Sequence, residues 1–437
     1  DRRSEGRRRC PMIGIMFLIF AICMILAIPV GFSIAISATA FLFFDAGIPI
    51  FSIVQKMIDG INSFSYLALP LFVLSGAIMV YGATPRLMRF ANMLLGRLPG
   101  GIGAAGCLGC GFFGAISGSG VATTASIGAI VGPEMVRQGY DKGFVASLLA
   151  ASGTLGLVIP PSVCMVVYSQ NASCSIGDMF LAGFIPGILA ELLLAVLSVV
   201  IAKRRKYQQV DVGVTNAREA ISITLDAFLP LLMPVIILGG TMSGVCTATE
   251  SAAVAVIYAF VLAKFVYREM TWDDLYRTLV NSAKSSASIL FIISASTPFG
   301  WVLTLENVTT TVSNAVFAVV KSPILVYAAV VLILIILGTF MESFTIIILT
   351  TPIFLPIVTA IGVDPVAYGL VLMFCICIGG VTPPLAVCLF TACKIVKIRI
   401  EESIPDVFMV LGILLFVTIL LMIFPQIALF LPSIAGT

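Results

Sequence analysis

The chain has 437 residues, of which 60% are hydrophobic and 10% charged, and its mean hydropathy is +1.16. Soluble domains average about 45–50% apolar and about 25% charged residues, so this composition excludes a soluble globular protein. The sequence contains no histidine, which excludes histidine-dependent zinc sites, Ser-His-Asp triads and haem ligation by histidine. The formal net charge of +3 is small, and the positions of the charges are more informative than their sum.

Long apolar stretches divide the chain into about a dozen elements of membrane-spanning length, because one helical crossing takes about 20 apolar residues. The stretches are continuous, unlike the short alternating segments of an outer-membrane barrel, so we predict an all-α polytopic membrane protein. In chain order they are 12–44, 64–82, 143–169, 178–202, 228–263, 285–303, 324–392 and 405–430.

The first residues, DRRSEGRRRC, are charged and are followed at once by Pro11. The next apolar run is too long for a signal peptide, so we expect residues 1–11 to be a leader or linker from a processed, trimmed or fused terminus. Counting crossings back from the later loops puts Arg7, Arg8 and Arg9 outside, against the positive-inside rule. A fused upstream helix or a non-native leader would explain this exception.

Lysine and arginine gather in five loops, which the positive-inside rule assigns to the cytoplasm. The loops around Asp178, Glu306 and Asp364 carry almost no positive charge and are expected outside. Residues 203–227 are predicted to be a cytoplasmic linker, and 268–286 an amphipathic helix on the membrane surface. The five basic loops are 86–97, 137–142, 203–218, 264–284 and 394–399.

Two apolar segments, 98–136 and 322–361, begin and end on the same side of the membrane in this topology. Their centres, GAISGSGVATTASIG (114–128) and GTFMESFTII (338–347), are polar where a lipid-facing helix would carry leucine. Irregular backbone at membrane depth persists only where it is buried in protein or lines a watery cavity. We therefore predict two re-entrant hairpins that enter from opposite faces.

A shift of 223 residues aligns unusual residues of the two halves. Because the hairpins enter from opposite faces, we predict inverted repeats at 12–202 and 228–403, followed by a C-terminal helix and tail at 404–437. Such repeats are typical of secondary transporters, whose substrate binds between them. The aligned pairs are Gly139 and Gly362, Asp141 and Asp364, Gly156 and Gly379, Pro160 and Pro383, Pro161 and Pro384, with Gly114 and Gly338, and Pro133 and Pro356, matching within one residue.

Each hairpin is followed by a helix, 143–169 or 366–392, that contains a Pro-Pro step. Proline removes an N–H and clashes with the preceding turn, so these helices must break. A break frees backbone carbonyls for sodium or another hard cation, while helix N-termini face anionic groups. The breaks fall at Pro160 and Pro161 and at Pro383 and Pro384.

Glu342 is the single acidic residue within the second hairpin. An intramembrane carboxylate indicates a functional site because its burial costs several kcal/mol. The sequence leaves open a substrate role, a proton route and a structural role beside a water-filled cavity. Glu250 lies outside the hairpins and broken helices, so we expect a structural or interfacial role. Thr123 and Thr124 offer hydroxyls either to a substrate or to helix packing.

Over residues 12–430 the chain resembles the large membrane subunit (the M, DctM-like subunit) of tripartite ATP-independent periplasmic (TRAP) transporters. The resemblance rests on a combination of motifs spread along the chain. Among them are GAISGSGVATTASIG (114–128), PEMVRQGYDKGFVASLLAASGTLGLVIPPS (133–162), FLAGFIPGIL (180–189), GTFMESFTIIILTTPIFLPI (338–357) and GGVTPPLAVCLF (379–390).

The resemblance implies a transporter rather than an enzyme, with sodium-coupled uptake of a carboxylate-bearing organic acid, a dicarboxylate or sugar acid, across the bacterial inner membrane. It implies an elevator mechanism, in which the hairpins and broken helices slide against scaffold helices at 12–82 and 228–263. It also implies two partners, a small four-helix membrane subunit (Q type) and a periplasmic substrate-binding protein (P type). Members of the sialic-acid type tend to carry aspartate where Thr123 and Glu342 stand, which favours a generic organic acid.

Carried over position by position, the resemblance places sodium at the two hairpin tips and the substrate between them. The expected sodium ligands are Ser117, Gly118, Ser119, Gly156, Gly338, Met341, Gly379 and Thr382. The expected substrate contacts are Thr123, Thr154, Ser162, Glu342 and Thr345.

Other functions fit the sequence less well. The main alternative is a stand-alone sodium-coupled anion symporter of related architecture that needs no binding protein. An intramembrane hydrolase would need paired aspartates or a Ser-Lys dyad, and no apolar segment offers either at helical spacing. A passive channel suits two inverted hairpins less well than alternating access does.

Overall fold

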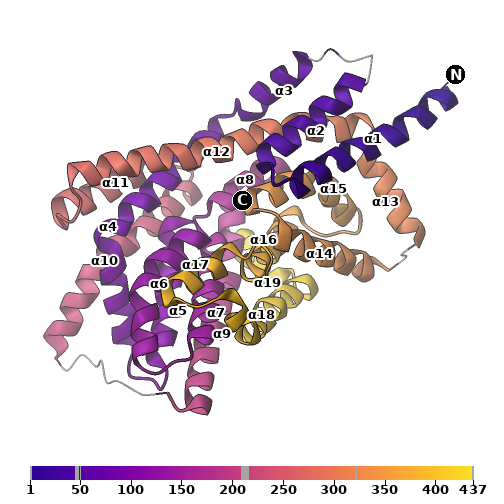
Figure 1. Cartoon of the computed structure of the whole chain (residues 1–437). Helices are drawn as coiled ribbons and strands as arrows, with labels where there is room; N and C mark the ends of the chain where they lie inside the picture. Colours follow the sequence, from indigo (N-terminus) through magenta and orange to yellow (C-terminus); the bar gives the residue numbers. More distant parts are fainter. Residues whose placement is uncertain (1, 45–48, 50, 208–215, 320–321, 436–437) are drawn as a thin grey trace.

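The computed structural model is a bundle of helices (Figure 1). The structure describes the backbone of residues 2–44, 49, 51–207, 216–319 and 322–435. Within these ranges there is no strand, and eight helices are long and apolar enough to cross a membrane. The prediction of an all-α polytopic membrane protein is therefore confirmed.

One group of helices, here called the outer body, is organised around α4 and α12. Helix α12 is 34 residues long and runs along α2, α3 and α4 (Figure 1). It begins with a capping box, in which the Thr271 N–H donates to Asp274 Oδ2 and the Asp274 N–H donates to Thr271 Oγ1. The outer body consists of α1 (Arg2–Ile25), α2 (Val30–Phe44), α3 (Phe51–Ile61), a 3-10 turn (Phe64–Leu67), α4 (Ala68–Leu95), α10 (Ala217–Met242), α11 (Ala248–Val261) with a π-helical end (Leu262–Val266), α12 (Trp272–Leu305) and α13 (Val308–Val319).

The other helices form the core body, in which the two halves of the chain interleave. α17 packs on α6 and α7, α18 packs on α7, and α15 packs on α8. The core body consists of α5 (Gly101–Ser117), α6 (Gly120–Arg137), α7 (Lys142–Thr154) with a 3-10 turn (Leu155–Leu157), α8 (Val163–Ala172), α9 (Ile176–Arg205), α14 (Pro323–Phe340), α15 (Ser343–Ala360), α16 (Pro365–Val381), α17 (Val387–Val396), α18 (Ile400–Ile423) and α19 (Gln426–Ala435).

The centre of the protein lies at α7 and α16. Every residue from 144 to 154 in α7 and from 366 to 379 in α16 is buried. These helices present no exposed face, which is why their sequences are apolar or small all round.

Residues matched by the 223-residue shift occupy the same places in the two halves. Gly139 and Gly362 both have positive φ values, +84° and +89°, in the turns that follow the hairpins. Asp141 and Asp364 then hold the N-cap positions of α7 and α16. The two Pro-Pro steps separate α7 from α8 and α16 from α17, and both Pro-Pro peptide bonds are cis. That the halves are inverted in the membrane stays a prediction.

Several boundaries differ from those expected. The predicted element 64–82 ends where α4 kinks, at Tyr81 and Gly82 (φ +94°), but the helix resumes and continues through the basic residues to Leu95. Residues 272–286 of the predicted surface helix 268–286 are the first part of the continuous α12. Both helices continue past the predicted boundary for the same reason: a change from apolar to charged residues marks where a helix leaves the membrane, and the helix itself can extend further.

The segments predicted as leader, linker and tail contain helix. α1 begins at Arg2, α10 begins at Ala217, and α19 lies within the expected tail. Residues 1, 208–215 and 436–437 of these segments, and the side chains of residues 2–12, lie outside the described part of the chain.

An ion-pair cluster ties together three helices of the core body at one end. Arg205, the last residue of α9, pairs through Nη1 with Asp141 Oδ2 and through Nη2 with Asp406 Oδ1, both at 2.7 Å. The Tyr207 hydroxyl donates to Asp141 Oδ2 at 2.6 Å. Burial and this hydrogen bond raise the pKa of Tyr207. The cluster therefore connects α9, the start of α7 and α18.

Candidate functional site

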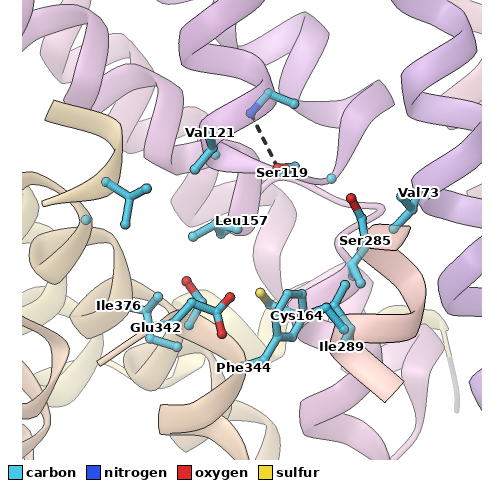
Figure 2. A pocket seen from close by; sticks show the side chains of 18 of the residues that line it. Val73, Ser119, Val121, Leu157, Cys164, Ser285, Ile289, Glu342, Phe344 and Ile376 are labelled. Carbon is cyan, nitrogen blue, oxygen red and sulfur yellow. Dashed lines mark hydrogen bonds between the residues drawn. The ribbon is translucent and has the colours of Figure 1, made fainter. Parts of the chain in front are cut away.

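The first hairpin turns at Gly118, between α5 and α6. Gly118 has φ +59°, a left-handed conformation that glycine adopts without a steric penalty. Ser119 is the N-cap of α6, and its hydroxyl accepts from the Ala122 N–H at 3.4 Å (Figure 2). The tip therefore presents the N-terminus of a helix.

The second hairpin turns without a glycine at its tip. Met341 is extended (φ −121°, ψ 151°), and Glu342 follows as the N-cap of α15 (φ −75°, ψ 151°). This tip also presents the N-terminus of a helix, but it carries a carboxylate there.

The first arm of each hairpin packs backbone against backbone on the helix that breaks. A Cβ atom on Gly114 would lie 2.8 Å from Gly156 Cα, and a Cβ atom on Gly379 would lie 2.2 Å from the Gly338 carbonyl oxygen. Only glycine permits such an approach. The paired glycines of the sequence repeat therefore fix the same contact in both halves.

A cavity of about 810 Å³ lies between the two tips and the outer body (Figure 2). The core body contributes both tips, the start of α8 and parts of α16 and α17, while the outer body contributes α2, α4 and α12. Among the described lining residues, Glu342 is the only one with a charged side chain. The polar lining residues are Ser117, Ser119, Thr154, Asn281, Ser282, Ser285, Ser288, Glu342 and Ser343.

The expected sodium ligands form two groups, one at each tip. Gly156 lies directly behind the first tip, against Gly114 and the Ser119 carbonyl. Thr382 ends α16 beside the second group, and its hydroxyl donates to the Ile378 carbonyl at 2.7 Å. The six other expected ligands line the cavity: Ser117, Gly118, Ser119, Gly338, Met341 and Gly379.

The expected substrate contacts divide into two classes. Glu342 and Thr154 line the cavity. Thr123 does not, because its hydroxyl donates to the Ser119 carbonyl at 2.8 Å and lies 2.9 Å from Ser117 Oγ. Ser162 and Thr345 lie behind the tips, fully buried, and do not line the cavity either.

Ser162 and Thr345 share one feature with a small set of buried hydroxyls in the described structure. The hydroxyl oxygen of each is buried and has no hydrogen-bond partner among the described residues. Ser162 lies against Gly118 of the first tip, and Thr345 lies in the first turn of α15 at the second tip. A buried hydroxyl without a partner costs about 1–3 kcal/mol, so each tip has an oxygen that an ion could satisfy.

One wall of the cavity is absent from the sequence-based expectations. Asn281, Ser285 and Ser288 of α12 line it from the outer body, and Figure 2 shows Ser285 and Glu342 on opposite sides of the pocket. Their spacing of i, i+4 and i+7 puts them on one helical face. This polar face is detectable in the sequence, but most of it falls within the segment 268–286, which the charge pattern assigns to the membrane surface.

Glu191 of α9 is a buried carboxylate that is also absent from the expected site residues. It is 5% exposed, and neither of its carboxylate oxygens has a hydrogen-bond partner in the described part of the chain. It packs against Gly111 of α5 and lies beside Ser152 of α7. The signal in the sequence is an acidic residue in the middle of the apolar stretch 178–202.

We expect Glu191→Met to raise the free energy of unfolding by about 1–3 kcal/mol, because a partnerless buried carboxyl is replaced by an apolar chain of similar length. Thermal unfolding of the purified protein in detergent measures the change. Glu250→Met is the matched control and should destabilise, because Glu250 Oε2 accepts from the Thr247 N–H at 2.7 Å in a capping box. A loss of stability in Glu191→Met would contradict this expectation and show that the carboxyl makes a stabilising contact, with Ser152, a water or an ion.

Comparison with known proteins agrees with the resemblance that the sequence motifs indicate. The family model described as "Tripartite ATP-independent periplasmic transporter, DctM component" matches residues 17–427. The isethionate TRAP transporter permease protein DctMQ of Oleidesulfovibrio alaskensis is 36% identical over 419 residues, covering 96% of this chain and 66% of that protein. The C4-dicarboxylate TRAP transporter large permease protein DctM of Pseudomonas aeruginosa is 37% identical over 386 residues, covering 88% of this chain and 90% of that protein.

A solved structure is similar in fold. The Alcanivorax borkumensis YdaH transporter matches with a TM-score of 0.58 at 14% sequence identity, covering 85% of this chain and 87% of that chain. At this identity the similarity shows a shared architecture.

Proposed function

The chain belongs to the DctM component family of tripartite ATP-independent periplasmic transporters, and we propose that it takes up a small organic acid together with sodium by an elevator movement. The family membership confirms the resemblance seen in the sequence. It also makes the chain a transporter permease and not an enzyme, located as a multi-pass protein in the bacterial inner membrane.

The observation that carries the sodium proposal is the buried, partnerless hydroxyl at each tip. Ser162 Oγ lies behind the first tip and Thr345 Oγ1 lies behind the second. Sodium is a hard cation that takes oxygen ligands, and broken helices at membrane depth offer such oxygens. We therefore place one sodium ion behind each tip, held by backbone and hydroxyl oxygens of the expected ligands with Ser162 or Thr345 added.

The substrate binds in the cavity between the tips. The N-terminus of α6 opens onto it through Gly120, Val121 and Ala122, and such a terminus attracts a carboxylate. The relatives named for isethionate and for C4-dicarboxylates support a small organic acid as substrate.

The movement takes place between the core body and the outer body. At their boundary Gly76 of α4 lies against the first tip, where a Cβ atom on it would be 2.9 Å from Ser117 Cα. Small residues let the two bodies pass closely. As in a tripartite system, a small membrane subunit would extend the outer body and a periplasmic binding protein would deliver the substrate.

Uptake of labelled organic acids into proteoliposomes tests the proposal. The vesicles contain the chain with its small subunit, with and without an inward sodium gradient and the binding protein. Uptake that requires both supports the tripartite sodium-coupled function. Uptake that needs sodium but ignores the binding protein supports the alternative of a stand-alone symporter, and uptake driven by a proton gradient alone contradicts sodium coupling.

The two hydroxyls give a sharper test of the sodium sites. Ser162→Ala and Thr345→Val should each raise the sodium concentration for half-maximal uptake by about 10-fold, the equivalent of about 1.4 kcal/mol. Thr418→Val is the control, since its buried hydroxyl already donates to the Leu414 carbonyl at 2.7 Å. An unchanged sodium dependence in both tip variants would refute the assigned sites.

A further inference from the structure

The cavity is electrostatically unsuited to a substrate with an anionic group at each end. Glu342 is the single charged side chain among the described lining residues, and no lysine or arginine is among them. Its Oε2 atom is buried and has no hydrogen-bond partner in the described structure. A second carboxylate placed beside it would set two like charges together with no lysine or arginine side chain of the described lining between them, which is unfavourable.

The two ends of the cavity differ in the sign of their electric charge. At one end lie Ser119 and Val121, where the N-terminus of α6 supplies a partial positive charge (Figure 2). At the other end lies Glu342, the N-cap residue of α15 and the single acidic residue among the described lining residues (Figure 2). A dipolar ligand can satisfy both ends at once, with its carboxylate toward α6.

The wall formed by α12 suits the same ligand. Asn281, Ser282 and Ser285 provide an amide and hydroxyls but no charge. Ser282 lines the cavity, and its buried Oγ atom has no hydrogen-bond partner among the described residues. An ammonium group has three donors, of which Glu342 satisfies one.

We propose that Glu342 selects a zwitterionic substrate, an organic acid with a cationic nitrogen at the end opposite its carboxylate. The nitrogen donates a charge-assisted hydrogen bond to the Glu342 carboxylate, and the carboxylate lies at the N-terminus of α6. This inference rests on the proposed function and narrows its substrate class.

The proposed selection of zwitterions is tested with organic acids that have the same carbon chain and differ only in the group at one end. 4-Aminobutyrate, 4-hydroxybutyrate and succinate share one carboxylate and differ at the other end, as do 5-aminovalerate, 5-hydroxyvalerate and glutarate. Binding is measured as sodium-dependent thermal stabilisation of the purified permease with its small subunit and without a binding protein, so that any selectivity belongs to the permease. We expect each zwitterion to bind at least about 10-fold more tightly than the dicarboxylate of equal length.

Glu342→Gln keeps the shape of the side chain and removes its charge, so the preference for the zwitterion should disappear. Glu306→Gln is the matched control, because Glu306 lies at the C-cap of α12 and does not line the cavity, and it should retain the preference. Tighter binding of the dicarboxylate by the unmodified protein would overturn the inference, and so would a zwitterion preference that survives in Glu342→Gln.

The experiment separates this inference from the proposed function. If sodium alone fails to stabilise the protein, the sodium sites of the proposed function are refuted. If sodium stabilises the protein but the probes follow the opposite order, or none binds up to tens of millimolar, only the zwitterion selection is refuted.

Discussion

Replacing Gly379 with alanine should lower the free energy of unfolding by about 3 kcal/mol and reduce uptake by at least about 10-fold. The new Cβ atom would lie 2.2 Å from the carbonyl oxygen of Gly338 and 2.4 Å from its carbonyl carbon. These are backbone atoms that cannot rotate away, so the whole first arm of the second hairpin has to move. Met341 and Glu342 follow that arm directly, and the displacement therefore reaches the cavity.

Gly412→Ala is the matched control for this substitution. Gly412 lies in the interior of α18, and a Cβ atom added there would meet no atom within 4 Å apart from the adjacent backbone of its own helix, so alanine should be neutral or stabilise by up to about 1 kcal/mol. Gly156→Ala should have an intermediate effect, because its nearest obstacle is the Thr123 hydroxyl, at 2.8 Å. Thermal unfolding and initial uptake rates measure all three. Equal behaviour of Gly379→Ala and Gly412→Ala would show that the hairpin is not held by this contact.

Replacing Arg205 with methionine should lower the free energy of unfolding by about 3 kcal/mol. The substitution removes the 2.7 Å ion pair with Asp406, a residue that is only 7% exposed, and leaves its carboxylate buried without a cation. The pair with Asp141 adds little to this figure, because the Asp141 side chain is 59% exposed and water screens it.

Two further variants isolate this effect. The double variant Arg205→Met with Asp406→Leu should recover most of the lost stability, since it removes the stranded charge as well. Arg277→Met breaks a pair with Asp273 in which both side chains are more than half exposed, and it should change stability by less than about 0.5 kcal/mol. If Arg205→Met and Arg277→Met cost the same, the cluster does not hold α9 and α18 together.

The repeat could be predicted in detail because its residues are constrained by the backbone. Gly139 and Gly362 are glycines because both turns need a positive φ. Gly156 and Gly379 are glycines because another backbone lies against each of them. Such requirements leave few alternatives, so the same residue types recur at one offset in both halves.

The cavity lining could be predicted only in part, because residue type does not determine where a hydroxyl points. Thr123 and Ser119 stand near the same tip, yet Thr123 turns back to bond a carbonyl of its own helix while Ser119 lines the cavity. Ser162 and Thr345, expected to face the substrate, lie behind the tips instead. The polar face of α12 depends on how that helix is rotated against the tips, which a single sequence does not specify.

The interleaving of the two halves has a consequence for biosynthesis. α7 is enclosed by α17 and α18, and Ser147 of α7 even donates to the Ser403 carbonyl of α18 at 3.3 Å. These partners emerge from the ribosome some 250 residues later, which at about 5–20 residues per second is a delay of roughly ten to fifty seconds. During that time the first hairpin and α7 are inserted without the neighbours that the second half supplies. The surface of the first half that α17 and α18 later cover, which contains small and polar residues, must therefore stay uncovered in the membrane until the second half has been synthesised.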